Sequence, residues 1–485
     1  MRAVTRPRLL LFLVAIVFAT ALLTPAQRDL FVGDETKYGQ VVREMRATGA
    51  WLLPTLEGVP FTHKPPVHFW LIKALTFPLG VYSTWAFAIP SLLAFAALLW
   101  LMMRMGGPVA AFVCATSLLI WGSAQTARMD VSFTLFIALG IWLMQRGRIE
   151  WAAVSIAIAT LIKGPMAPVI VILLFALSRG GPERLPLRRI VVALLILAAI
   201  PMLWFVPAMM SGGSSYTHDV LQKQLAGRAV GSWVHASPPW YYVAHAPGFL
   251  FPWFILGITA IVKRWREQRF NILWIFAVLI PYSLMSSKLD VYMMALIPPL
   301  SLVIADCVEH VEVATHRANL AMLVALVVIG AAAPFVRGVP AGIPIKTIGS
   351  MLAGAAFIGL FASIRGRFAS TIAVGLAPLA PLVFIALTLM PAVNELATTR
   401  PLIRALVAEH VAPEQIALYS CPYLWSRDMP PELERVHYVT PQSFAASGAH
   451  VVATSRRHAA EIGLRGFTKS RELQMIGKPF DVYRR

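Results

Sequence analysis

The sequence predicts an α-helical membrane protein with many spans, followed by a small α/β domain at its C-terminal end. Of the 485 residues, 58% are hydrophobic and only 13% are charged, and the mean hydropathy is +0.70. A soluble globular protein carries about 25% charged residues. Long runs without any charge alternate here with short charged segments. This alternation is typical of a polytopic membrane protein.

Apolar runs bounded by charged or turn residues give thirteen candidate spans. Several are shorter than the about 20 residues that a perpendicular transmembrane helix needs. The neighbouring runs 150–162 and 165–178 are either two spans or one broken helix. The predicted spans are 9–26, 86–103, 108–123, 131–145, 150–162, 165–178, 190–209, 247–262, 270–286, 291–307, 319–336, 348–364 and 369–391.

The first run resembles a signal peptide, because arginines precede it and Thr24-Pro25-Ala26 follows. Leu9 to Ala26 is, however, uninterrupted for 18 residues. A signal-peptide core has about 7–15. We therefore interpret it as an uncleaved first helix.

The distribution of Lys and Arg predicts the orientation. With a cytoplasmic N-terminus, the N-terminal segment and the cytoplasmic loops together carry 17 of these residues, and the short opposite loops carry 5. Positive charge collects on the cytoplasmic side of membrane proteins. The prediction is a bacterial inner-membrane protein whose C-terminus and two long loops, 27–85 and 210–246, lie on the periplasmic side.

The net charge of +19 is explained by this topology. Loop cations set orientation and meet anionic lipid headgroups. No nucleic-acid-binding motif is present, so membrane lipids are the expected partners and nucleic acid is not. Cys114, Cys307 and Cys421 show no CxxC spacing, which argues against structural zinc and a disulfide framework.

Two domains are expected: a transmembrane domain over 1–391, which includes both long loops, and a soluble periplasmic α/β domain over 392–485. In the second domain, short β-favouring runs predict strands and Arg456–Leu464 predicts a helix. The predicted strands are Ile416–Tyr419, Val436–Thr440, Val451–Thr454 and Phe480–Tyr483.

The first long loop predicts two interfacial helices. After Gly33-Asp34, the apolar positions Tyr38, Val41, Val42 and Met45 form one helical stripe, which Gly49 ends. A second helix begins at Pro65-Pro66, with Val67, Trp70, Leu71 and Ala74 on one face. Amphipathic helices with aromatic residues lie flat at a membrane interface.

Asp34 stands where an N-cap belongs, so capping and catalysis are both open explanations. Glu35 lies roughly 100° further round the helix. The two carboxylates therefore cannot face one substrate atom, and we choose Asp34.

Ionisable residues recur in the short outer loops: Arg128 and Asp130, Lys163, and Lys288 with Asp290. For any single cation, including Lys64, snorkelling to the interface is an ordinary explanation. Together they predict a cationic bowl suited to a phosphate. The second long loop adds Lys223, Gln224, Arg228 and His235, then the aromatic run Trp240-Tyr241-Tyr242, which is typical of an interface belt.

Several motifs resemble one family. The first loop reads Asp34-Glu-Thr-Lys-Tyr, then Trp51-Leu-Leu-Pro-Thr-Leu-Glu-Gly-Val-Pro and Lys64-Pro-Pro. The similarity continues at Arg128-Met-Asp, Leu161-Ile-Lys-Gly-Pro, Gln224-Leu-Ala-Gly-Arg, Pro239-Trp-Tyr-Tyr and Ser287-Lys-Leu-Asp-Val-Tyr. This ordered set, over nearly the whole chain, resembles bacterial aminoarabinose transferases, which belong with protein O-mannosyltransferases among the GT-C-fold glycosyltransferases.

The resemblance implies an inverting transfer of a sugar from a polyprenyl-phosphate donor, such as undecaprenyl phosphate, to lipid A, another glycolipid or a protein. It implies Asp34 as base or acceptor-orienting carboxylate and Asp130 as second acid. The donor phosphate would be held by Lys64, Arg228, Lys163 and Lys288. The cavity would be lined by Glu35, Lys37, Tyr38, His63, Arg128, Gln224 and Tyr292. Cations can stabilise the leaving phosphate, so we expect no obligatory metal or other cofactor. We also expect a monomer.

The sequence departs from the family pattern at His63, where Glu often precedes Lys-Pro, at Lys288-Leu289-Asp290, and around Lys223. These departures leave the sugar and the acceptor open.

Two other functions make different predictions for this sequence. A transporter or flippase of a lipid-linked sugar should carry ionisable groups near mid-membrane in broken helices. Here they cluster at one face, apart from Asp306, and no internal repeat is apparent. A catalytically silent scaffold is disfavoured because Asp34, Lys64 and Arg228 are retained.

Overall fold

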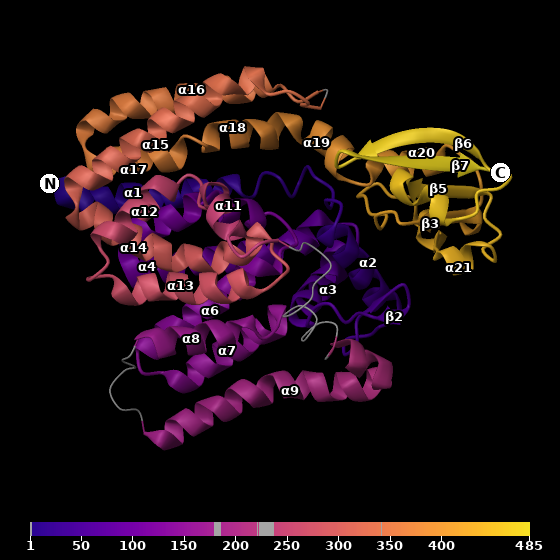
Figure 1. Ribbon diagram of the computed structural model, residues 1–485, viewed down its shortest axis with the longest axis horizontal. Helices are drawn as coiled ribbons and strands as arrows, with labels where there is room; N and C mark the ends of the chain where they lie inside the picture. The colour runs from indigo at the N-terminus through magenta and orange to yellow at the C-terminus, as the bar shows by residue number, and fades with distance from the viewer. Residues whose placement is uncertain (1, 179–185, 221, 223–236, 341) are drawn as a thin grey trace. The chain divides into compact units, whose positions relative to one another are not determined.

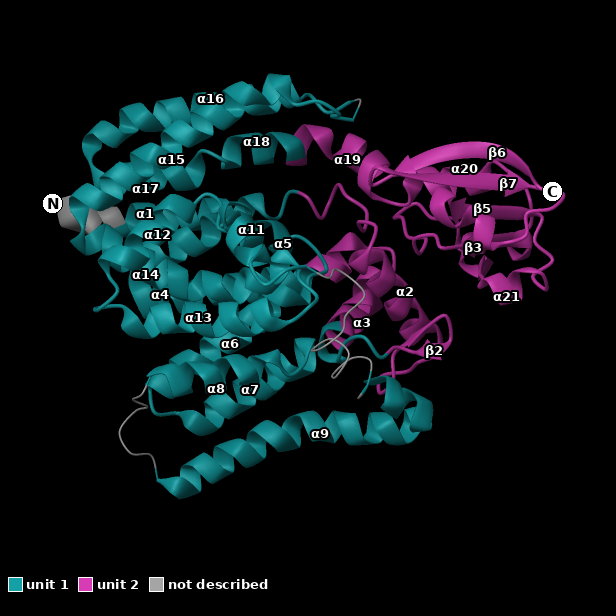
Figure 2. Cartoon of the chain, viewed as in Figure 1, with its two compact units in different colours: residues 1–23, 62–68, 89–385 teal, residues 24–61, 69–88, 386–485 magenta. Residues whose placement is uncertain are grey.

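The computed structural model describes residues 2–178, 186–220, 222, 237–340 and 342–485. Helices dominate it, and a small sheet lies near the C-terminal end (Figure 1). By packing, the chain forms two compact units (Figure 2). Unit 1 comprises residues 1–23, 62–68 and 89–385, and unit 2 comprises 24–61, 69–88 and 386–485.

Unit 1 is a helical bundle. Short 3₁₀ segments, η2 (Asp290–Leu296), η3 (Ala333–Phe335) and η4 (Ser363–Arg365), join some of its helices, and the π-turn η5 (Ile385–Leu389) follows the last. Its helices are α1 (Arg2–Thr20), α4 (Thr84–Thr116, which begins in unit 2), α5 (Leu118–Ala124), α6 (Met129–Gln145), α7 (Ile149–Lys163), α8 (Met166–Ser178), α9 (Leu187–His218), α11 (Tyr241–Phe249), α12 (Phe254–Lys263), α13 (Arg269–Leu284), α14 (Ile297–His310), α15 (Glu312–Ala332), α16 (Ile345–Ala362), α17 (Arg367–Leu376) and α18 (Leu379–Phe384).

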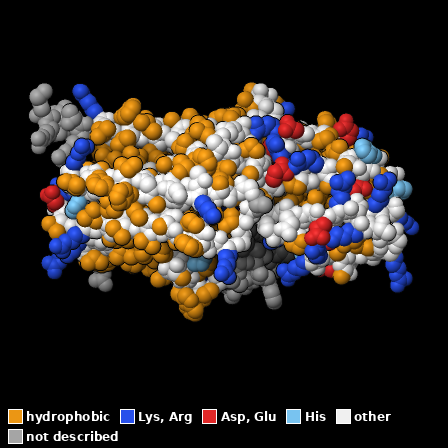
Figure 3. Space-filling view, turned by 90° about the horizontal axis from the view of Figure 1, so that it is seen from above, with side chains coloured by type: hydrophobic (Ala, Val, Ile, Leu, Met, Phe, Trp, Pro, Cys, Tyr) orange, Lys and Arg blue, Asp and Glu red, His pale blue; other side chains and the backbone are white. Residues whose placement is uncertain are grey.

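The surface of this bundle is that of a membrane protein. Hydrophobic side chains spread over the helical part in Figure 3, whereas charged side chains of both signs are interspersed at the sheet-containing end. Helix α9 is the extreme case, since Leu187, Leu203 and Met210 are 74%, 77% and 81% exposed. Such an apolar exterior is stable only against lipid.

Each predicted span overlaps one or more helices, although α1 ends at Thr20 and α4 covers the span 86–103 together with the first part of 108–123. Among the described residues, six helices are long and apolar enough to cross a membrane, or up to eight if each bent pair is one span. The helices α7 and α8 are separate, because Gly164 adopts φ 106° between them. A multi-pass membrane protein is therefore confirmed, while the number thirteen and the orientation of the ends stay predictions.

Two predicted spans are broken. Run 108–123 divides at Ser117, and α5 meets α6 at 119°. Run 247–262 divides into α11 and α12, which meet at 113° on either side of Pro252. Proline and its preceding residue are poor continuations of a helix, so a break at this point is expected.

Unit 2 joins most of the first long loop to the C-terminal domain. The loop supplies α2 (Asp34–Ala47), the hairpin β1 (Thr55–Leu56) and β2 (Val59–Pro60), and most of α3 (Val67–Leu79). Both interfacial helices predicted from the sequence are thus present, and Tyr38, Val41, Val42 and Met45 are all buried. The domain division predicted at 391/392 placed this loop with the spans, whereas its contacts group most of it with the C-terminal residues.

The C-terminal part begins with α19 (Met390–Ala397) and α20 (Arg400–Val407). In the described residues it contains a five-stranded sheet of order β4-β3-β5-β7-β6, in which β3 is parallel to β4 and β5, and β7 is antiparallel to β5 and β6. The strands are β3 (Ile416–Tyr419), β4 (His437–Tyr438), β5 (Val451–Ser455), β6 (Thr468–Met475) and β7 (Lys478–Arg484). Short helical turns connect them: η6 (Pro413–Gln415), η7 (Pro431–Arg435), α21 (Pro441–Phe444) and η8 (Arg456–Glu461).

A strand is present at each of the four predicted positions, although β4 covers only His437–Tyr438 of the predicted Val436–Thr440. One expectation was wrong and one strand was not predicted. The predicted helix Arg456–Leu464 is only the 3₁₀ segment η8, which ends at Glu461. Strand β6 was missed, because Thr468–Met475 is mostly exposed and polar and lacks an apolar alternation. It forms because β7 supplies an antiparallel partner along its length, from Thr468 opposite Arg484 to Met475 opposite Lys478, with one shift of register between Lys469 and Arg471.

Helices α15 and α16 approach through two glycines. A Cβ at Gly349 would lie 2.5 Å from the Gly330 carbonyl oxygen and 2.3 Å from the Ala333 Cβ. Both distances are far inside van der Waals contact. The crossing therefore depends on the absence of side chains at this point.

We predict that Gly349→Ala destabilises the protein by about 1–3 kcal/mol through overpacking. Gly354→Ala is the matched control on the same helix, since nothing lies within 4 Å of its Cβ position. An exposed helical glycine replaced by alanine stabilises a helix by up to about 1 kcal/mol. In detergent, the thermal unfolding midpoint of Gly349→Ala should lie below that of the wild type, whereas that of Gly354→Ala should not. Equal midpoints for the two variants would contradict the close approach of α15 and α16.

Candidate functional site

A cavity of about 430 Å³ lies within unit 1. Its walls come from the segment before α3, the α7–α8 junction, one face of α9, and the segment from α13 to η2. The lining residues are Thr62, His63, Lys64, Pro65, Thr160, Leu161, Lys163, Gly164, Pro165, Met166, Pro201, Met202, Trp204, Phe205, Tyr216, Val220, Tyr282, Met285, Ser287 and Tyr292. One side is cationic and the α9 side is apolar and aromatic.

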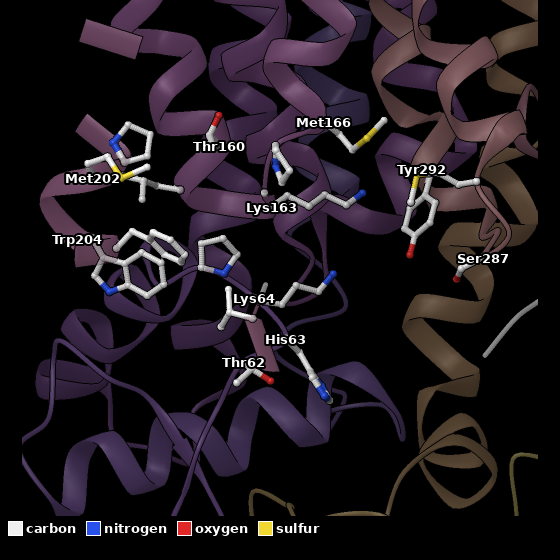
Figure 4. Close-up of a pocket in the computed structure, with 18 of the residues that line it drawn as sticks. Thr62, His63, Lys64, Thr160, Lys163, Met166, Met202, Trp204, Ser287 and Tyr292 are labelled. Atoms are coloured by element: carbon white, nitrogen blue, oxygen red, sulfur yellow. The ribbon is translucent and has the colours of Figure 1, made fainter. Parts of the chain in front are cut away.

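Two lysines bring positive charge to this cavity. Lys64 precedes the Pro65-Pro66 step that starts α3, and Lys163 is the last residue of α7 before Gly164. In Figure 4 the ammonium groups of both lysines point toward the side of the cavity on which Tyr292 lies. His63 and Lys64 enter from one segment, so two residues predicted for the cavity do line it.

Lys163 is held by a buried acid and by aromatic rings. Its ammonium forms an ion pair with Asp130 in the first turn of α6, and both side chains are less than a tenth exposed. The same ammonium lies 4.4 Å from the centre of the Tyr292 ring and 5.2 Å from that of Phe133. The ion pair and the ring faces together fix one position for the charge.

Two tyrosines line the cavity beside Lys163. Tyr282 and Tyr292 stack with ring centres 5.1 Å apart. Tyr282 is 2% exposed, and its hydroxyl has no hydrogen-bond partner among the described residues. A buried hydroxyl without a partner costs free energy unless a ligand or water completes it. Tyr292 was predicted for the cavity, whereas Tyr282 was not.

Lys288 does not line the cavity. It is 3% exposed, and its ammonium donates to the Ser237 carbonyl oxygen at 2.9 Å and to that of Met285. Burial lowers the pKa of this ammonium. The neighbouring Ser287 lines the cavity instead. The ammonium of Lys288 thus ties two loop segments together, and the phosphate role of this residue stays a prediction.

The Asp34 motif lies in unit 2. Gly33, with φ 117°, is the N-cap of α2, so Asp34 is the first helical residue and not the cap that its position suggested. Asp34 and Lys37 are half-buried. Glu35 is buried and is bound by the Arg28 guanidinium, with Nη1–Oε2 at 2.6 Å and Nη2–Oε1 at 2.9 Å.

Tyr38 is 3% exposed and packs edge-on against Phe69, with ring centres 5.2 Å apart. Its environment is the apolar core of unit 2, as is usual for a tyrosine on a buried helix face. Glu35 is thus bound to Arg28, and Tyr38 is packed against Phe69. Both side chains have partners within unit 2, which the sequence did not predict.

Other predicted residues are placed as follows. Arg128 is the N-cap of α6, two residues before Asp130, and its carbonyl oxygen accepts from Ser91 Oγ at 3.0 Å. Lys223, Gln224, Arg228 and His235 lie outside the described residues. The described part of the chain holds no group of three or more His, Cys, Asp or Glu side chains arranged for a metal ion.

The α9 wall was not foreseen as part of a site. Met202, Trp204 and Phe205 fall in the predicted span 190–209, where they look like ordinary lipid-facing residues. The only signal in the sequence is the adjacent pair of aromatic residues in a run that is otherwise mostly aliphatic.

The fold defines a class: a multi-pass membrane protein with the fold of ArnT. Two crystal structures of ArnT from Cupriavidus metallidurans are similar over almost the whole chain. The one bound to undecaprenyl phosphate superposes with a TM-score of 0.70 over 98% of this chain and 97% of that one, at 17% identity. The apo structure also gives 0.70, over 99% and 98%, at 18% identity.

The particular relatives are named undecaprenyl phosphate-alpha-4-amino-4-deoxy-L-arabinose arabinosyl transferases. That of Pectobacterium atrosepticum is 28% identical over 329 residues, 60% of this chain and 58% of that protein. One of Pseudomonas fluorescens is 29% identical over 325 residues, 61% and 58%. That of Yersinia pestis is 25% identical over 342 residues, 63% and 61%. The chain thus spans less than two thirds of these relatives, and no family model matches. The resemblance seen in the motifs is confirmed.

We predict that Asp130→Ala, which leaves the Lys163 charge buried without its partner, costs about 3–5 kcal/mol of stability. The double variant Asp130→Ala/Lys163→Ala should recover most of that loss, because no buried charge remains. Thermal midpoints of the two variants in detergent measure the difference. A double variant no more stable than the single one would show that the ion pair does not hold Lys163.

Proposed function

We propose that this protein is an inverting glycosyltransferase that moves a sugar from an undecaprenyl-phosphate donor to lipid A or a similar glycolipid at the periplasmic face. The observation that carries the proposal is a cavity with two lysines on one side and an apolar wall on the other. A prenyl phosphate needs both in one place. The names of the relatives support the donor and suggest 4-amino-4-deoxy-L-arabinose as the sugar.

The donor phosphate is assigned to Lys64 and Lys163. As the bond from the sugar C1 to the phosphate oxygen breaks, its electron pair goes to the phosphate, and negative charge develops there. Cations already fixed in a water-poor site stabilise that charge without reorganising. Asp130 holds the Lys163 ammonium in place, so we assign it an orienting role and not the role of a second acid. The α9 wall suits the first prenyl units.

The acceptor is assigned to Asp34. A hydroxyl oxygen of the acceptor attacks C1 from the face opposite the phosphate, and its proton passes to the carboxylate. The new C1–O bond forms as the old one breaks, so the configuration inverts. Asp34 is half-buried at the first turn of α2, while the carboxylate of Glu35 is engaged by Arg28. Of the two carboxylates of the motif, we therefore assign the base role to Asp34.

The location follows the charge distribution. With 17 Lys and Arg in the cytoplasmic segments and 5 in the short opposite loops, the N-terminus is cytoplasmic and unit 2 periplasmic. This orientation puts the Asp34 segment on the periplasmic side, as the proposed reaction requires.

The proposal is tested with purified protein in liposomes that contain lipid A and the undecaprenyl-phosphate aminosugar. Mass spectrometry should find lipid A that carries the sugar. A flippase would move the donor across the bilayer and give no glycosylated product, and that outcome would refute the transferase.

In this assay, Asp34→Asn should lower kcat by about 100–10,000-fold, the usual contribution of a general base. Glu432→Gln is the control, an exposed acid of the same unit. Circular dichroism should be the same for both variants, since Asp34 is not the cap of α2. Full activity of Asp34→Asn would show that the base lies elsewhere.

Lys64→Ala should weaken donor binding by roughly 10–150-fold, because a charge-assisted hydrogen bond contributes about 1.5–3 kcal/mol. Lys346→Ala, at an exposed lysine of unit 1, is the matched control. The KM for the donor reports the difference. If the two variants have the same donor KM, the cavity does not hold the phosphate.

A further inference from the structure

We propose that Asp29 is a positioning residue: through it, the C-terminal domain sets the place and direction of Asp34. This inference rests on the proposed function, because it concerns the carboxylate assigned as base. All the contacts that carry it lie within unit 2.

The first step is the direction of Asp34. Glu35 accepts two hydrogen bonds from Arg28 and one from the Phe31 backbone N–H at 2.9 Å. Arg28 is itself 1% exposed, and its guanidinium carbon lies 4.7 Å from the centre of the Phe31 ring. With Glu35 fixed inward, Asp34, about 100° away on the helix, is turned away from this contact. The Arg28–Glu35 pair therefore determines which way Asp34 faces.

The second step is the anchor of Arg28. Its chain neighbour Asp29 is 0% exposed and receives two hydrogen bonds from Arg400, Nε–Oδ2 at 2.6 Å and Nη2–Oδ1 at 3.1 Å. Ser426 Oγ donates to Oδ2 at 2.6 Å. A fully buried carboxylate bound in this way permits one arrangement of its backbone. Asp29 thus links the Asp34 segment to residues nearly 400 positions later.

The third step is the backbone of the same segment. Asn394 Oδ1 accepts from the Asp29 N–H at 3.0 Å, and Asn394 Nδ2 donates to the Gln27 carbonyl at 2.9 Å. The Val32 N–H donates to the Ala397 carbonyl at 2.8 Å. Arg427 Nη2 donates to the Arg28 carbonyl at 2.7 Å. Contacts from α19 onward thus hold both sides of Asp29 and leave Asp34 at the end of a clamped segment.

The chain offers a matched control for this carboxylate. Asp481, on β7, is 2% exposed and also receives two hydrogen bonds from one arginine, Arg456 Nε–Oδ2 at 3.1 Å and Nη2–Oδ1 at 3.0 Å. Lys469 adds an ammonium at 2.8 Å. Its partners Arg456 and Lys469 lie on η8 and β6, in the sheet region. Asp29→Asn and Asp481→Asn therefore remove comparable buried charges, and only the first adjoins Asp34.

In the transfer assay with intact protein, we expect Asp29→Asn to lower kcat by about 100-fold, the effect of roughly 1 Å of misplacement. The donor KM should stay unchanged, because Lys64 and Lys163 are untouched. Asp481→Asn should keep its kcat even if its thermal midpoint falls equally. Equal losses of kcat in the two variants would show that Asp29 acts only through stability.

Hydrogen–deuterium exchange provides a readout that needs no activity. Asp29→Asn should speed exchange in residues 29–37, where the Phe31 and Val32 amides are held, and Asp481→Asn should not. If Asp29→Asn does not fold, Ser426→Ala removes one donor, and a smaller change of the same kind is expected. Unchanged exchange in residues 29–37 would overturn the inference. A wild type without transfer activity would instead refute the proposed function, and the exchange result would still decide this one.

Discussion

A charge removed from water must be paired or fully hydrogen-bonded, and this constraint organises both units. Asp130 with Lys163 and Arg264 with Asp306 join helices inside the bundle, and Arg28 with Glu35 and Asp29 with Arg400 join segments of unit 2. Each pair offsets a desolvation cost of several kcal/mol per ion. Because the partners come from distant parts of the sequence, each pair also selects one way of bringing those parts together. The cavity depends on this directly, since Lys163 has its position from Asp130 and from the ring of Tyr292.

The helical class, the interfacial helices and four strands could be predicted because local patterns cause them: uncharged runs, a helical stripe after Asp34, and β-branched runs. What failed depended on partners. Strand β6 has no apolar alternation and exists through its pairing with β7. The short segment after β5 contains helix-forming residues, but it closes after Glu461 because Ile462 packs into the core beneath the sheet.

The candidate site shows the same division. Lys64, Lys163, His63 and Tyr292 stood out as polar residues beside apolar runs, and all four line the cavity. Lys288 stood out equally, yet its ammonium donates to two backbone carbonyls. A sequence pattern does not distinguish a lysine that binds loop carbonyls from one that binds a ligand. Tyr282 and the α9 aromatics were overlooked for the opposite reason, since they are indistinguishable from lipid-facing residues until the bundle is folded.

Trp425 has a practical consequence for anyone who wishes to study the C-terminal domain alone. It is fully buried, it fills the space over Gly39, where a Cβ would come within 2.7 Å of its ring, and its indole N–H donates to the Val81 carbonyl at 3.2 Å. A fragment cut at residue 392 would strip this ring of its cover and would leave Arg400 without Asp29. Such a fragment would expose a hydrophobic aromatic surface and would be prone to aggregate. A soluble version would need residues 24–61 and 69–88 spliced to it, so the independently expressible piece is discontinuous in the gene.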